Sequence, residues 1–126
     1  MNGQQVVLDQ SLTCKVKNVI YIAQCSVCAA EKEQKEDTYF GQTTTEARQR
    51  FNGHRGKFKV DNELSYTKSA LAQHCFNEHP EQMDLKLFKL GLVKRCAAMQ
   101  LDREEHRFIS KFRTDVYGIN RIKVVK

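Results

Sequence analysis

Residues 39–54 read Tyr-Phe-Gly-Gln-Thr-Thr-Thr-Glu-Ala-Arg-Gln-Arg-Phe-Asn-Gly-His, and this stretch decides the fold. Its aromatic opening favours a short strand that ends near Gly41. Thr43, with Glu46 three residues later, has the pattern of a capping box, in which each side chain pairs with a backbone amide at a helix start. We therefore expect a strand, a threonine-rich turn and a helix that begins near Thr44.

The expected helix has an apolar stripe with a basic edge. The side chains that recur at helical spacing, and would face the core, are Ala47, Phe51, His54 and Phe58. Arg50 lies one turn before His54, which places a guanidinium and an imidazole on the same side. Arginine offers a rigid fork of donors that matches phosphate, so this pair suits an anion. The pattern equally fits a solvated basic helix with one core histidine, and this stretch alone leaves both interpretations open.

Length, charge and cysteine content narrow the class of protein. The chain has 126 residues, enough for one modest core, and a formal net charge of +6, which suits a polyanionic partner such as nucleic acid. No stretch approaches the roughly 20 apolar residues of a membrane span, and the polar residues 1–10 lack a signal-peptide core. Five cysteines without a secretory signal favour reduced thiols or metal ligands over disulfides. We therefore expect an intracellular protein.

The segments before residue 41 predict a hairpin. Residues 1–15 show no period, so we expect a flexible arm before a domain that spans 16–126. Residues 16–24 are rich in β-branched and aromatic side chains and favour a strand, with 38–40 returning as its antiparallel partner beyond a charged tip. By the period of two, Tyr21 would lie on the same sheet face as Tyr39.

The later segments add helices and one strand. We expect a helix over 66–77 that Pro80 stops, a strand over 85–93, a helix over 97–112, a turn over 115–118 and a basic tail over 121–126.

Glu105 lies within the apolar stripe of the 97–112 helix, which consists of Leu101, Phe108, Ile109 and Phe112. A carboxylate on an apolar face is unfavourable unless it is paired or bound to a cation. Either an ion pair with Arg50 or another base, or a divalent metal, would compensate Glu105. The neighbouring Glu104 would point elsewhere, as a surface charge.

Two residue pairs have the spacing of metal ligands. Cys25 and Cys28 are spaced as in a zinc knuckle, and four residues separate His74 from His79, as in paired histidine ligands. A zinc ion on all four would join the hairpin tip to the end of the 66–77 helix and contribute directly to folding. The alternative is a pair of buried thiols with a pair of surface histidines.

Five short motifs, in order, resemble the signature of the GIY-YIG endonuclease family. They are Ile20-Tyr21, Tyr39-Phe40-Gly41, Arg50 with His54, Glu105 before Phe108-Ile109, and Gly118-Ile119-Asn120. Val19 stands in place of the first glycine of the eponymous triplet, and Phe40 in place of an isoleucine. The resemblance covers about residues 17–122 and implies an α/β (α+β) fold, in which helices flank a small three-stranded antiparallel sheet.

The resemblance also implies metal-dependent hydrolysis of DNA phosphodiester bonds, with nicking as the expected outcome. Tyr21 would be the general base or would orient the attacking water, with Tyr39 as its partner at the phosphate. Arg50 would stabilise the charge of the phosphorane. His54 would assist proton transfer or position the tyrosine.

Two further roles follow from the same likeness. Glu105 would hold a single Mg²⁺ or Mn²⁺ ion, and Asn120 would brace the site. The alternative to an endonuclease is a non-cleaving DNA- or junction-binding module of the same fold, and a third hypothesis is a zinc-stabilised protein-interaction module.

Among GIY-YIG domains, the chain looks most like those of Penelope-like retroelements, which have a cysteine pair between the tyrosine motifs and histidines downstream. This likeness favours a structural zinc ion bound by Cys25, Cys28, His74 and His79, and it implies a nuclear protein. Cys75 could replace one histidine, whereas Cys14 and Cys96 are assigned to packing.

Contacts to DNA are expected to rest on charge. The basic residues that would extend the helix past the site are Arg48, Arg55, Lys57 and Lys59, and those that would flank its other side are Lys111, Arg113, Arg121 and Lys123. Phosphate contacts weaken with salt and carry little sequence information. We therefore expect a fused or partner domain to supply targeting.

Overall fold

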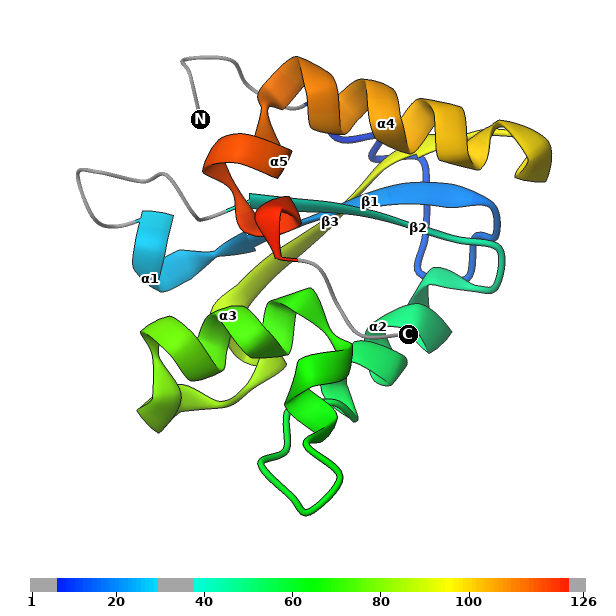
Figure 1. Ribbon diagram of the computed structural model, residues 1–126. Helices are drawn as coiled ribbons and strands as arrows, with labels where there is room; N and C mark the ends of the chain where they lie inside the picture. Colours follow the sequence, from blue (N-terminus) through cyan, green and yellow to red (C-terminus); the bar gives the residue numbers. More distant parts are fainter. Residues whose placement is uncertain (1–6, 30–37, 123–126) are drawn as a thin grey trace.

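The computed structural model describes residues 7–29 and 38–122. Its centre is a three-stranded antiparallel sheet in the order β2-β1-β3. The strands are β1 (Val19–Cys25), β2 (Thr38–Thr43) and β3 (Phe88–Arg95). In Figure 1, α4 (Leu101–Phe112) crosses one face of the sheet, while α2 (Ala47–Arg55) and α3 (Ala70–Glu78) lie on the other. The fold class predicted from the sequence is confirmed.

The side chains of β1 alternate between the two faces of the sheet, because successive residues of a strand point to opposite faces. Ile20 and Ile22 pack under α4, together with Phe40, Val93, Leu101 and Phe112. Val19 and Tyr21 pack with Ala47 and Phe51 of α2. Ala23 and Cys25 pack with Ala70, Leu71 and Cys75 of α3. The central strand is therefore covered on both faces, and Tyr21 belongs to the α2 side.

The predicted capping box is wrong. Thr43 is the last residue of β2, and its hydroxyl hydrogen-bonds Thr45 in the turn rather than a helix amide. Glu46 is the N-cap of α2, with no side-chain capping bond, and pairs with Arg48 instead. Because pairing in the sheet fixes the backbone of Thr43, α2 begins at Ala47 and ends before Phe58, which still packs against Phe88.

Several other boundaries shift by a few residues. The predicted 66–77 helix consists of a 3₁₀ turn and then α3, whose N-cap Ser69 accepts a hydrogen bond from the amide of Ala72. The remaining elements are α1 (Ser26–Ala29), α5 (Thr114–Tyr117) and 3₁₀ turns at Ser65–Lys68, Pro80–Gln82, Leu85–Leu87, Ala98–Gln100 and Ile119–Arg121. The charged tip at 30–37 and the tail from 123 lie outside the described residues.

The segment before β1 is irregular but anchored from residue 7 onward. The amide of Asp9 donates to the carbonyl of Leu92, and the carbonyl of Val16 accepts from the amide of Ala47. Leu12 and Val16 pack against the α2 core. The described part of the arm is therefore held against the sheet and α2.

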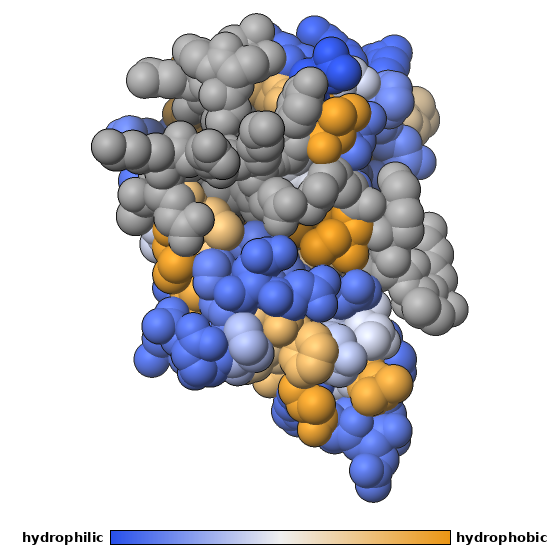
Figure 2. Space-filling view, turned by 60° about the vertical axis from the view of Figure 1, so that its left-hand side comes forward, coloured by the Kyte–Doolittle hydropathy of each residue, from blue (hydrophilic) through white to orange (hydrophobic). Residues whose placement is uncertain are grey.

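Among the described residues on the face drawn in Figure 2, most of the surface is hydrophilic, with smaller apolar patches between. Exposed apolar side chains include Val60 and Leu64 in the loop after α2. Over the described residues, every helix is too short or too polar to cross a membrane.

Candidate functional site

Tyr21 and Tyr39 lie side by side on the α2 face, as the sequence predicts. In the register of β1 and β2, Tyr21 is opposite Gly41 and Ala23 is opposite Tyr39, and the two ring centroids are 6.3 Å apart. Tyr21 is fully buried, and Phe51 packs edge-on against it at 5.3 Å. A Cβ atom on Gly41 would overlap the phenol carbon and oxygen of Tyr21. Glycine is therefore required there for the Tyr21 ring to cross β2.

His54 connects this tyrosine to α3. Its Nε2 is 2.7 Å from the phenol oxygen of Tyr21, and its Nδ1 is 2.9 Å from the hydroxyl of Ser69. Only 3% of His54 is exposed, and burial, aided by the charge of Arg50, lowers its pKa to about 3. The imidazole is therefore neutral at physiological pH and has one ring proton.

Arg50 places its guanidinium beside both phenols. Burial acts to lower the pKa of Arg50, but interaction with Tyr21 and Tyr39 outweighs it and raises that pKa. Burial raises the pKa of Tyr21 well above its ordinary value and also raises that of Tyr39, while Arg50 acts in the opposite direction on both. In the free protein both tyrosines are therefore protonated phenols at neutral pH.

Glu105 reaches this site from the opposite layer, past the edge strand β2. Burial, with the charge of Asp102, raises the pKa of its carboxyl, against a hydrogen bond from Gln42 and the charge of Arg50. The pKa of Tyr39 is raised first by burial and second by the charge of Glu105. Within the described part of the chain, Glu105 forms no direct ion pair with Arg50. The described part of the structure therefore does not contain the ion pair with Arg50 that was one of the two alternatives for Glu105.

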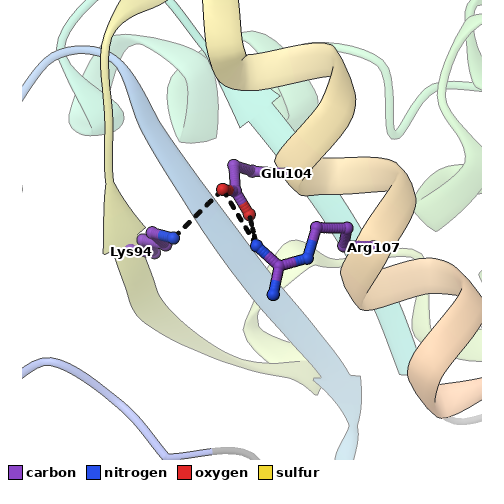
Figure 3. Close-up of polar contacts among 3 residues, drawn as sticks. All are labelled: Lys94, Glu104 and Arg107. Carbon is purple, nitrogen blue, oxygen red and sulfur yellow. Dashed lines mark hydrogen bonds and ion pairs between the residues drawn. The ribbon is translucent and has the colours of Figure 1, made fainter.

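Glu104 corrects the sequence analysis, which placed it at the surface. It is 5% exposed and accepts hydrogen bonds from Lys94 of β3 at 3.1 Å and from Arg107 at 2.9 Å (Figure 3). The hydrogen bond from Lys94 lowers the pKa of Glu104, against a smaller effect of burial, and Arg107 adds to the lowering. The side chains of Lys94 and Arg107 are themselves 43% and 67% exposed. Glu104 is thus covered by two solvated cations on the β3 flank of α4, whereas Glu105 lies on the β2 flank.

The flank of Glu104 also has a shallow hollow of about 400 Å³, lined in part by Lys94, Arg107, Phe108 and Lys111. The two acidic residues are consecutive, and they turn to opposite sides of the apolar stripe because neighbouring helical positions are about 100° apart. The sequence showed the stripe but not which strand lies under each flank.

Asn120 braces β2 rather than entering the tyrosine pair. Its amide donates to the carbonyl of Phe40 at 2.9 Å and accepts from the amide of Phe40 at 2.8 Å and from the hydroxyl of Thr114 at 2.7 Å. A Cβ atom on Gly118 would lie 2.6 Å from the carbonyl of Thr38, so this close approach requires glycine. The two residues hold the strand that carries Tyr39 and Gly41.

The predicted DNA-binding side chains follow α2 and the loop after it. Arg48 is exposed beside Glu46, Arg55 donates to Asn52 at 2.8 Å, Lys57 is half-buried and Lys59 is exposed. Lys111 and Arg113 are exposed at the end of α4. Lys123 and the side chain of Arg121 lie outside the described residues.

The four predicted zinc ligands come together. Their ligand atoms all lie within 4.8 Å of one another, and three of the side chains, those of Cys25, His74 and His79, are buried. The Cys28 sulfur is 3.4 Å from Nε2 of His74 and 3.3 Å from Nε2 of His79. With bonds of about 2.3 Å to sulfur and 2.0–2.1 Å to nitrogen, tetrahedral zinc separates such atoms by roughly 3.6 Å. The Cys2His2 cluster could therefore bind a metal such as zinc with little rearrangement.

The other cysteines differ from one another. Cys75 is buried near Cys25, and burial raises the pKa of its thiol to about 12, but it is not among the clustered ligand atoms. Cys96 is half-buried against the α4 core, in agreement with a packing role. Cys14 is exposed, so its assignment to packing is wrong.

Sequence reasoning missed Ser69, Gln42 and Asp102. Asp102 precedes Glu105 by one helical turn, which is a usable signal, and accepts a hydrogen bond from Gln42. Ser69 directly precedes an apolar helical run, which indicates an N-cap but not its contact with His54.

No family model, curated protein or solved structure matches this chain. The site must therefore be interpreted from its own geometry. It combines a fixed cation, a pair of protonated phenols, a neutral imidazole and a carboxyl whose pKa is raised by burial. Such a set can bind an anionic group, orient a water molecule and hold a cation.

Proposed function

We propose that this chain is a metal-dependent DNA endonuclease of the GIY-YIG type that hydrolyses phosphodiester bonds, with nicks as its main product. The observation that carries the proposal is the convergence of five polar side chains from β1, β2, α2 and α4, which are Tyr21, Tyr39, Arg50, His54 and Glu105. An apolar core gains nothing from such a set, because every buried polar group must be paired. Catalysis on an anion gives all five a use.

Arg50 is the residue that would bind the scissile phosphate. It extends from the exposed side of α2, and its charge is fixed because its pKa is raised by the neighbouring phenols. Hydrolysis adds negative charge to the non-bridging oxygens in the transition state, and a preorganised guanidinium stabilises that charge.

Tyr21 would orient the attacking water rather than act as a resident base. A base must first lose its own proton, and burial raises the pKa of this phenol well above the working range. As a protonated phenol it can both accept and donate hydrogen bonds. Tyr39, which is half-buried, would present its oxygen at the solvent edge of the same pair.

Glu105 would hold the divalent cation. Burial raises the pKa of this carboxyl, and a bound cation would offset the unfavourable burial of its charge. One or two carboxylates with water fit the requirements of Mg²⁺ or Mn²⁺ better than a softer metal, and Asp102 is the neighbour that could support Glu105. When bound, the ion would supply Lewis-acid stabilisation of the phosphate and a lowered pKa for nearby water.

We also propose that the Cys2His2 cluster is a structural zinc site. The cluster supplies four side-chain ligands, which is typical of structural zinc, whereas catalytic zinc keeps one position open for water. The site would join β1 and α1 to α3, and so would stabilise the layer that carries His54 against the sheet.

Plasmid cleavage tests the catalytic proposal. Supercoiled DNA is incubated at low salt with Mg²⁺, with Mn²⁺ or with EDTA, and wild type is compared with Glu105→Gln and Glu104→Gln. These variants remove one charge each from adjacent positions of α4, so the second is a matched control. We expect relaxed product with wild type and Glu104→Gln, and none with Glu105→Gln or EDTA.

Other outcomes identify the alternatives. If wild type binds the plasmid without cutting it, the chain is a DNA- or junction-binding module of the same fold. Equal cleavage by Glu105→Gln and wild type would contradict the metal-binding role of Glu105. Absence of both binding and cleavage would reject nucleic acid as the substrate.

A further inference from the structure

The hydroxyl of Ser69 occupies a junction between α3 and the tyrosine pair. Ser69 is the N-cap of α3 and is 3% exposed. Its oxygen accepts a hydrogen bond from the amide of Ala72 at 3.4 Å and lies 2.9 Å from Nδ1 of His54. The first contact uses an oxygen lone pair, so the single hydroxyl hydrogen remains available.

That hydrogen decides the state of His54. Among the hydrogen bonds of the described residues, the Ser69 hydroxyl has two partners: the amide of Ala72, which donates to it, and Nδ1 of His54, which can accept from it. If Ser69 donates to Nδ1, this nitrogen has no proton, and the single proton of the neutral ring must lie on Nε2. Nε2 is 2.7 Å from the oxygen of Tyr21, so the histidine becomes the donor in that contact.

We propose that Ser69 is a positioning residue, which fixes His54 in the Nε2-protonated tautomer and makes it a hydrogen-bond donor to Tyr21. The opposite tautomer would donate from Nδ1 to Ser69 and would leave the buried hydroxyl hydrogen without its acceptor. An unmade hydrogen bond of a buried group is unfavourable, so the geometry selects the first arrangement.

The tautomer gives the whole chain of hydrogen bonds one direction. His54 then donates to the oxygen of Tyr21, and the charge of Arg50 also acts on this phenol, so the hydrogen of the phenol is directed away from them. Tyr39 is its ring neighbour on the sheet, with the ring centroids 6.3 Å apart, and is half-buried. Donors thus follow one another from Ser69 through His54 and Tyr21 to Tyr39, and hydrogen bonds aligned in this way strengthen one another.

The direction has a consequence for catalysis, which rests on the proposed endonuclease function. A histidine that donates to Tyr21 cannot also accept its proton. The phenol would therefore keep its hydrogen and direct it towards Tyr39, and Ser69 would act through His54 without touching substrate.

Nitrogen NMR tests the tautomer directly, without any assay of activity. In the ¹⁵N-labelled full chain at neutral pH, long-range correlations distinguish protonated from bare ring nitrogens, and loss of one set in His54→Gln assigns the signals. We expect a bare Nδ1 and a protonated Nε2 for His54. Ser69→Thr should keep this pattern, and Ser69→Ala should lose its bias. A protonated Nδ1 in wild type overturns the inference even if Ser69→Ala fails to fold.

Cleavage provides the second readout. We expect Ser69→Ala to slow nicking by about 10–100-fold, the range seen when a metal-bound histidine loses its hydrogen-bond partner, and Ser69→Thr to restore most of the rate. Gln73→Ala is the matched control, because Gln73 also holds the start of α3, through the carbonyl of Thr67 at 2.7 Å, and should cut normally.

The two levels of the proposal fail separately. If wild type does not cut, the endonuclease function is wrong while the NMR result still decides the tautomer. If wild type cuts and Ser69→Ala cuts as fast, Ser69 has no positioning role.

Discussion

Replacing Gly41 by alanine should damage the tyrosine site through packing alone. The new methyl group would overlap the phenol carbon and oxygen of Tyr21 and would lie 2.8 Å from its Cε2. Tyr21 cannot yield easily, because it is fully buried, packs on Phe51 and is hydrogen-bonded to His54. Overpacking of a core costs about 1–3 kcal/mol, and loss of the tyrosine hydrogen bond adds about 1 kcal/mol. We therefore expect Gly41→Ala to lower the free energy of unfolding by roughly 2–4 kcal/mol.

Gly53→Ala is the control that makes this prediction sharp. Gly53 lies inside α2, and a Cβ atom there would meet nothing within 4 Å. Alanine in a helix interior is better than glycine by about 0.5–1 kcal/mol, so this variant should be more stable than wild type. Urea unfolding with excess zinc, followed by circular dichroism, compares the three proteins. If Gly41→Ala lies within 0.5 kcal/mol of wild type (about the scatter for neutral substitutions), the argument from the Tyr21 ring is refuted.

Three further predictions concern zinc, protons and DNA. In the presence of zinc, Cys28→Ser should have a lower melting temperature than wild type, because the cluster would no longer hold the ion. A chelator should lower the melting temperature of wild type but not that of Cys28→Ser. Cys14→Ser, at an exposed thiol, should behave as wild type in both measurements. The pKa of His54 is about 3 when folded and near 6.5 when unfolded, so its contribution to stability is complete above pH 6.5 and declines as the pH falls towards 3. His54→Gln should reduce the change in the free energy of unfolding between pH 6.5 and 3, and His106→Gln, at an exposed histidine, should not. Unfolding measured at a series of acid pH values checks this. Lys57→Ala and Lys59→Ala should each reduce the slope of log affinity for DNA against log salt by about 1, whereas an unchanged slope would remove these residues from the interface.

The sequence predicted what depends on period and order. Alternation along β1 correctly put Tyr21 and Tyr39 on one face, and the spacing of the Cys25-x-x-Cys28 and His74/His79 pairs, together with the retroelement likeness, correctly predicted that these four residues cluster. Local geometry fixes the face on which each tyrosine lies and brings the members of each Cys or His pair together, whereas the meeting of the two pairs depends on the packing of α3 against β1. The same local patterns failed at the start of α2, where pairing in the sheet held Thr43 and left Glu46 as the cap.

The predictions that failed depend on tertiary neighbours. The sequence analysis placed Glu105 within the apolar stripe and Glu104 outside it, yet both residues lie three or four positions from Leu101 and from Phe108. Lys94 of β3 lies under the Glu104 flank, and Gln42 of β2 lies under that of Glu105, so strand order separates the surroundings of the two carboxyls. A sequence does not state which edge strand lies under which side of a helix.

The two candidate centres share the same supports, and this explains how a small domain could hold a polar site. Tyr21 and Cys25 lie on one face of β1, while α3 carries Ser69 at its start, His74 within it and His79 at its end. A metal on the Cys2His2 cluster would fix the far end of α3 against β1. The near end would then be held where the Ser69 hydroxyl meets His54. Because hydrogen-bond geometry tolerates only a few tenths of an ångström, rigidity imposed at one end of this nine-residue helix would be transmitted to the tyrosine pair at the other.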